Sequence, residues 1–145
     1  MPTKDELYAF AMDLYESAEQ SLARDGSVLP TKTLLLADEK KVCIAVPEGL
    51  NSPVADAVAD AVKTFAPKAV GSASEAWVAP EHAHVRASEH PNRVEAIVVS
   101  VQSKDGSLCL VATFDRDEHG APRSPSAPVA SWNPESEGVY GNLCV

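Results

Sequence analysis

The residues best suited to chemistry lie in one short stretch, H-A-H-V-R-A-S-E-H-P-N-R at positions 82–93. This stretch carries three of the four histidines of the chain, with arginines at positions 86 and 93 and a glutamate at position 89. Imidazole nitrogens are common zinc ligands, and arginines hold carboxylate or phosphate groups through charge-assisted hydrogen bonds. The stretch can therefore be a metal site, an anion-binding loop or a polar surface turn.

The metal interpretation depends on His82 and His84, which are two positions apart. In an extended segment both imidazoles point to the same side. Two histidines leave a zinc or iron ion short of ligands, so His90 or Glu95 would have to complete the site. His90 lies beyond a bend and Glu95 opens a predicted strand. We therefore predict a polar surface connection without a physiological metal, with His82, His84 and Glu95 as the candidate ligands should the segment fold back.

The second half of the stretch has a different logic, because Pro91 fixes its own φ angle between Glu89 and Arg93. The simplest interpretation is an ion pair between Glu89 and Arg93 that ties the turn to the following strand. The alternative is a ligand site in which Arg86 and Arg93 hold a small anion, oriented by Glu75 or Glu89.

Trp77 lies in the strand before this loop and belongs to the same candidate ligand site. A tryptophan can serve as a platform for a ligand, but it also buries a large apolar area. We expect Trp77 in the core. The candidate ligand-binding residues of this region are Glu75, Trp77, Arg86, Glu89 and Arg93.

Sequence signatures of catalysis are absent elsewhere: there is no G-x-S-x-G, no phosphate-binding glycine loop and no H-E-x-x-H. Cys43, Cys109 and Cys144 are odd in number and share no short spacing, which argues against a disulfide framework or a zinc knuckle. We therefore assign no catalytic residue and no cofactor, and we expect a non-catalytic protein.

Length and charge narrow the class of protein further. A chain of 145 residues makes one ordinary domain. Its net charge of -9 repels a phosphate backbone, which argues against a nucleic-acid partner. Met1 leads into charged residues without an apolar run, and no window reaches the roughly 18 apolar residues of a membrane span, so we expect neither a signal peptide nor a membrane partner. A cytoplasmic location is the expectation.

Hydrophobic periodicity predicts the order of the secondary structure elements. Residues 3–24 form an amphipathic helix that a Thr3–Glu6 capping box begins and Gly26 ends. Strands at 33–37 and 42–46 make a hairpin, a second helix runs from 52 to 65, and strands follow at 69–79, 94–102 and 108–115. Lys104-Asp105-Gly106 is a hairpin turn.

The order α-β-β-α-β-β-β predicts a single α+β domain over residues 1–117, with helices packed on a mostly antiparallel five-stranded sheet. Residues 118–145 hold four of the prolines and show no regular period. We expect these residues to form an irregular tail whose apolar residues pack on the domain or on a neighbouring subunit.

Two stretches, Ser74-Glu-Ala-Trp77 and Ser88-Glu-His-Pro-Asn-Arg-Val-Glu95, resemble those of small, uncharacterised bacterial and phage-borne proteins. The resemblance covers about residues 3–116 and implies a shared fold without a known activity. The order of elements also resembles roadblock and profilin-like modules, which is an analogy of fold and carries no function.

From these observations we expect a non-catalytic, acidic, cytoplasmic module that binds another protein or a second copy of itself. The missing catalytic motifs and the apolar tail, which needs a surface to cover, motivate this expectation. The alternative is a small-anion-binding protein or an enzyme with a site at residues 75–95.

Overall fold

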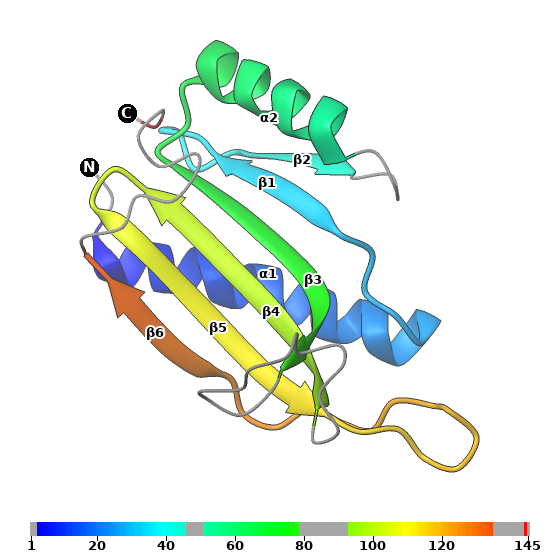
Figure 1. Cartoon of the computed structure of the whole chain (residues 1–145). Coiled ribbons are helices and arrows are strands. Elements are labelled where there is room, and N and C mark those ends of the chain that lie inside the picture. The colour runs from blue at the N-terminus through cyan, green and yellow to red at the C-terminus, as the bar shows by residue number, and fades with distance from the viewer. Residues whose placement is uncertain (1–2, 46–50, 79–92, 135–143, 145) are drawn as a thin grey trace.

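The protein folds as one α+β domain in the computed structural model, which describes residues 3–45, 51–78, 93–134 and 144. In these ranges, two helices pack on opposite faces of a six-stranded antiparallel open sheet (Figure 1). The fold class predicted from the sequence is confirmed. No helix in the same ranges combines the length and apolarity that a membrane crossing needs.

The elements follow one another along the chain as α1 (Lys4–Asp25), β1 (Thr31–Leu35), β2 (Lys41–Ala45), α2 (Asn51–Phe65), β3 (Ala69–Val78), β4 (Val94–Ser103), β5 (Gly106–Phe114) and β6 (Val129–Asn133). Every predicted helix and strand is present within a few residues of its expected ends. The sheet order is β2-β1-β3-β4-β5-β6, so β2 and β6 are its outer strands among the described residues.

The ends of α1 follow the signals in its sequence. The Thr3 hydroxyl accepts a hydrogen bond from the Glu6 backbone N–H at 3.1 Å, as expected for an N-cap. Gly26 adopts a φ of 76° and donates its N–H to the Leu22 carbonyl at 2.9 Å. Both predicted helix signals are confirmed.

Strand β6 lies in the segment that we expected to be irregular, and that expectation is wrong for residues 129–133. The strand is short, lies between prolines and is mostly exposed, so no hydrophobic period marks it. It is held by backbone pairing with β5 over Ser107 to Val111, and Trp132 packs against the core from its inner face. Strand β6 therefore forms because β5 offers a strand to pair with, although its own sequence has no hydrophobic period.

The core is divided between the two faces of the sheet. On one face, α1 contributes Leu7, Phe10, Ala11, Tyr15, Ala18 and Leu22, which pack on residues of β3, β4 and β5. On the other face, Val58 and Val62 of α2 pack on Leu34, Val70 and Cys144. Each helix therefore covers a different part of the sheet (Figure 1).

Gly71 of β3 marks the closest approach of α1 to the sheet. A Cβ atom at this position would lie 2.3 Å from Leu14 Cδ1 and 3.0 Å from Phe10 Cε2. Those distances are shorter than van der Waals contact, so the helix occupies the space where a side chain would stand. The glycine therefore sets where α1 sits across the strands.

A Gly106→Ala variant tests the junction of the β4–β5 hairpin with β6. Gly106 has a φ of 142°, and a Cβ there would meet the Asn133 carbonyl oxygen at 2.6 Å and Pro134 Cα at 2.8 Å. Both neighbours are backbone atoms that cannot rotate away. We expect a loss of about 3 kcal/mol in the free energy of unfolding, measured by urea denaturation.

Gly120→Ala is the control, because Gly120 also has a positive φ of 79° but nothing lies near its absent Cβ. It should cost only about 1 kcal/mol from backbone strain. Equal losses in the two variants would contradict the close approach of β6 to Gly106.

Tyr15 provides a pH-dependent test of the core under α1. Burial, and next the neighbouring Glu19 carboxylate, raise the pKa of the Tyr15 hydroxyl from 10.0 to about 12. Between these values the unfolded chain loses this proton while the folded protein keeps it, so Tyr15 ionisation lowers stability as pH rises from 10 to 12. Tyr15→Phe should remove that part of the alkaline loss, as measured by urea denaturation at several pH values.

Tyr8→Phe is the matched control, since Tyr8 lies on the same helix and is 44% exposed. It removes a hydroxyl from the exposed side of the helix and should leave in place the alkaline loss of stability that Tyr15 causes. A Tyr15→Phe variant that follows the wild-type curve up to pH 12 would show that the hydroxyl reaches water.

Candidate functional site

The residues proposed as a site at 75–95 divide into described and undescribed ones. Glu75, Trp77, Arg93 and Glu95 lie in or next to β3 and β4. The remaining candidates, His82, His84, Arg86 and Glu89, lie outside the described residues, as does His90. The expected Glu89–Arg93 ion pair and the expected absence of a metal at the histidines therefore stay predictions.

Arg116, which follows β5, links the two candidate carboxylates. Its Nε donates to Glu95 Oε2 at 2.8 Å, and its Nη2 lies 3.7 Å from Glu75 Oε2. Its Nη1 also donates to the carbonyls of Gly26 at 3.2 Å and Gly120 at 3.0 Å. The Glu95 carboxylate, as the largest cause, raises the pKa of Arg116. One guanidinium thus joins β3, β4, the end of α1 and the loop after β5.

Glu75 makes a second contact, because its carboxylate accepts a hydrogen bond from the backbone N–H of Val28. Val28 lies between α1 and β1. Glu75 therefore fixes the path of this connection, and neither it nor Glu95 orients Arg93 in the described structure. The sequence offers no local signal for this role of Arg116, which comes from contacts between positions distant in the chain.

Trp77 is 43% exposed, so the expectation of a core tryptophan is wrong. Its position in β3 lies opposite Glu95, beyond the part of the sheet that α1 covers. The Arg93 guanidinium stacks over its ring with its carbon 4.8 Å from the ring centroid. A hollow of about 220 Å³ lies beside them, lined by Glu75, Ala76, Trp77 and Glu95. An anion entering it would meet two carboxylates.

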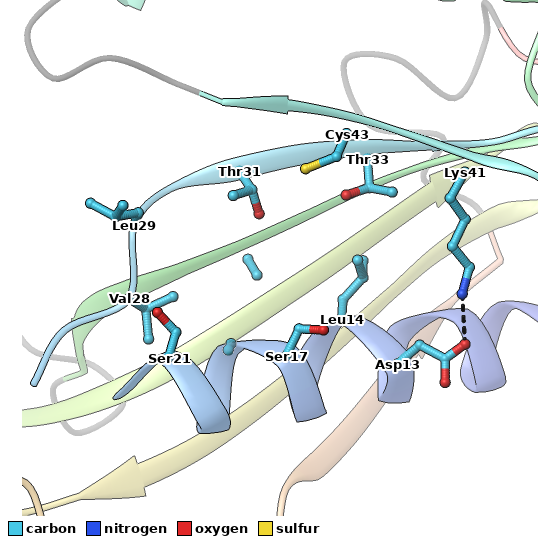
Figure 2. A pocket seen from close by; sticks show the side chains of 12 residues that line it. Asp13, Leu14, Ser17, Ser21, Val28, Leu29, Thr31, Thr33, Lys41 and Cys43 are labelled. Atoms are coloured by element: carbon cyan, nitrogen blue, oxygen red, sulfur yellow. Dashed lines mark hydrogen bonds and ion pairs between the residues drawn. The ribbon is translucent and has the colours of Figure 1, made fainter. Parts of the chain in front are cut away.

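A larger groove lies between α1 and the strands β1 and β2 (Figure 2). Its volume is about 400 Å³, within the range of ligand sites in proteins. Leu14, Ala18, Val28 and Ala73 supply apolar surface. The remaining lining residues are Asp13, Ser17, Ser21, Leu29, Thr31, Thr33, Lys41 and Cys43.

Some polar groups of the groove form hydrogen bonds or ion pairs within the protein, and others do not. Lys41 Nζ donates to Asp13 Oδ2 at 2.8 Å and closes one end with an ion pair between β2 and α1. Ser21 donates to the Ser27 carbonyl. Thr33 is only 6% exposed, and its hydroxyl makes no hydrogen bond to any described residue. The Thr33 hydroxyl therefore opens onto the groove, whereas the buried side-chain hydroxyl that lacks a hydrogen-bond partner among the described residues is that of Tyr15.

The three cysteines lie in three environments, and none forms a disulfide. Cys43 is exposed at the groove. Cys109 is half-buried on the other face of the sheet, where burial raises the pKa of its thiol. Cys144 is buried against Leu34 and Val70. Cys43 is therefore the thiol best placed to report on the groove.

Sequence reasoning missed the groove because its residues come from α1, the α1–β1 connection, β1, β2 and β3. None belongs to a motif. One local signal existed: Thr31 and Thr33 alternate in β1, and Lys41 and Cys43 alternate in β2, which places four polar side chains on one face of the hairpin.

Among the described residues, histidine, cysteine and acidic side chains form no group of three or more that could hold a metal ion. Comparison with known proteins finds no matching family model, no similar curated protein and no similar solved structure. The residues themselves must therefore carry any functional argument.

An Arg116→Lys variant tests the Arg116 clamp, by which we mean the contacts of this guanidinium with two carboxylates and with the carbonyls of Gly26 and Gly120. Lysine keeps the charge but cannot contact two carboxylates and two carbonyls with one planar group. We expect a loss of about 2 kcal/mol in the free energy of unfolding, measured by urea denaturation.

Arg123→Lys is the matched control, because Arg123 contacts Asp115 through side chains that are 61% and 67% exposed. It should change stability by less than about 0.5 kcal/mol. An Arg116→Lys variant as stable as this control would show that the clamp contributes little.

Proposed function

We propose that the protein is a non-catalytic, acidic, cytoplasmic module that binds a segment of another protein in the groove between α1 and the β1–β2 hairpin. The observation that carries this proposal is the groove itself, with a volume of about 400 Å³, apolar walls and the hydroxyls of Thr31 and Thr33 among its lining. Pockets of this kind, mostly apolar with a few polar groups, are typical of binding sites.

The position of the groove favours a polypeptide partner. Strand β2 is an outer strand of the described sheet, and its residues Lys41 and Cys43 line the groove. An outer strand presents unpaired backbone groups that another chain can use. A partner segment can therefore gain backbone hydrogen bonds and bury side chains at the same place.

Charge favours a different protein over a second copy. The chain carries a net charge of -9, so two copies repel one another, whereas a basic segment is attracted. The partner that fits is therefore a lysine- or arginine-rich segment with apolar side chains.

The alternative function, a small-anion-binding protein or an enzyme at residues 75–95, has less support from the described residues. Glu75 and Glu95 line the hollow there, and both contact Arg116. Their charges oppose an anion, and the two carboxylates act as anchors for Arg116.

A Ser17→Trp variant tests the groove as the binding site. Ser17 is exposed on α1 and lines the groove, so a tryptophan there fills the space without replacing a core residue. Peptides selected on the wild-type protein from a random phage-displayed library should bind this variant at least about tenfold more weakly, which corresponds to about 1.4 kcal/mol. Binding is measured by biolayer interferometry.

Ala9→Trp is the matched control, since Ala9 is exposed on the same helix and does not line the groove. This variant should bind the selected peptides like the wild type. Peptides that bind the Ser17→Trp protein with unchanged affinity would show that the groove is not the site.

A further inference from the structure

We propose that the partner segment binds as an added antiparallel strand on β2, with backbone hydrogen bonds to Lys41 and Cys43 and a tyrosine or tryptophan side chain in the groove. This inference rests on the proposed function and specifies how the partner is held. It follows from the direction of the backbone groups of β2, the direction of its side chains and the chemistry of the groove.

The hydrogen-bonding pattern of the β1–β2 hairpin gives the direction of the backbone groups. The Leu36 N–H donates to the Lys40 carbonyl at 2.8 Å, so this pair is hydrogen-bonded. In an antiparallel ladder, hydrogen-bonded and non-hydrogen-bonded pairs alternate. With the observed register, Val42 and Ile44 turn their backbone groups toward β1, and Lys41 and Cys43 turn theirs outward.

The opposite strand agrees with this assignment. The Leu35 carbonyl accepts a hydrogen bond from the Lys68 N–H at 2.8 Å, so it points toward β3 and away from β2. Leu35 is the register partner of Lys41. The Leu35–Lys41 pair is therefore not hydrogen-bonded, which leaves the Lys41 backbone groups facing the outer edge.

The side chains of the same two residues face the groove. Lys41 and Cys43 both line it, and they alternate with Val42 and Ile44, which pack on the α2 side of the sheet. Residues directly opposite each other in an antiparallel pair project to the same face. The partner residue opposite Cys43 therefore sends its side chain to the groove side, beside Cys43 and two strands away from Thr33.

The lining of the groove determines which side chain fits there. Leu14, Ala18 and Ala73 offer apolar contact, while the Thr33 hydroxyl lines the groove and can pair with a hydrogen-bonding group. Tyrosine and tryptophan combine a large apolar ring with one polar group. The space of about 400 Å³ admits either ring. With the net charge of -9, the partner is a basic, extended segment with an aromatic residue at this position.

The test uses a synthetic peptide of alternating lysine and valine with a central tyrosine, titrated against the full chain. In Cys43→Pro the outward N–H is lost, while the hydrogen bonds of Val42 and Ile44 to β1 remain. We expect the affinity for the peptide to fall at least about tenfold in Cys43→Pro. In Cys43→Ala, which keeps the N–H and loses the thiol, the affinity should change by less than about threefold.

A measurement on the wild-type protein keeps the test independent of how well Cys43→Pro folds. Peptides N-methylated on alternate residues block either the edge that faces β2 or the opposite edge. Only one of the two methylation patterns should abolish binding, and the unmethylated peptide should slow alkylation of the Cys43 thiol. Equal binding of both methylated peptides, or no binding of the unmethylated peptide to the wild type, would overturn strand addition.

The outcomes also separate this inference from the proposed function. Groove binding without strand addition predicts that Ser17→Trp weakens binding of the phage-selected peptides while Cys43→Pro binds them like the wild type, which would overturn the inference alone. If neither variant weakens that binding, both the inference and the proposed function are wrong.

Discussion

The structure depends on a mismatch of widths, because a single helix cannot cover a sheet of six strands. An α-helix with its side chains is about 10 Å across, whereas six strands at about 4.8 Å spacing extend over about 24 Å. Helix α1 lies over β3, β4 and β5, where Gly71 lets Leu14 and Phe10 approach the backbone. Among the described residues, no helix covers the β1–β2 side of that face, and the groove lies there. Helix α2 covers the opposite face of β1 and β3, at Leu34 and Val70.

Polar contacts fix α1 in this off-centre position at several points along its length. Near its start, the Lys68 ammonium group contacts the carboxylates of Glu6 and Glu39, and these contacts raise the pKa of Lys68. In the middle, Lys41 contacts Asp13 across the end of the groove. At its end, Arg116 contacts the Gly26 carbonyl. These contacts resist a slide of the helix toward β1 and β2, which would close the groove.

The sequence predicted the parts of the fold that local signals specify. Thr3, Glu6 and Gly26 marked the ends of α1, and Lys104-Asp105-Gly106 marked the β4–β5 turn, with Gly106 as the residue of positive φ. The sequence did not predict the features that depend on contacts between distant parts of the chain. Strand β6 exists through pairing with β5. Trp77 is exposed because α1 ends short of it, although its own neighbours suggested burial. The Arg116 clamp and the groove both join residues far apart in the chain, and no spacing rule connects them.

Two features that can accept a partner lie together on the groove side of the molecule. Thr33 lines the groove with a hydroxyl that makes no hydrogen bond to a described residue, and the adjacent strand β2 presents the outward backbone groups of Lys41 and Cys43. Edge strands in natural proteins are usually protected, and departures from such local rules concentrate at functional sites. On the proposed binding mode, one partner segment uses both features at once, because the strand that pairs with Cys43 also sends a side chain to the face of the sheet where the groove lies.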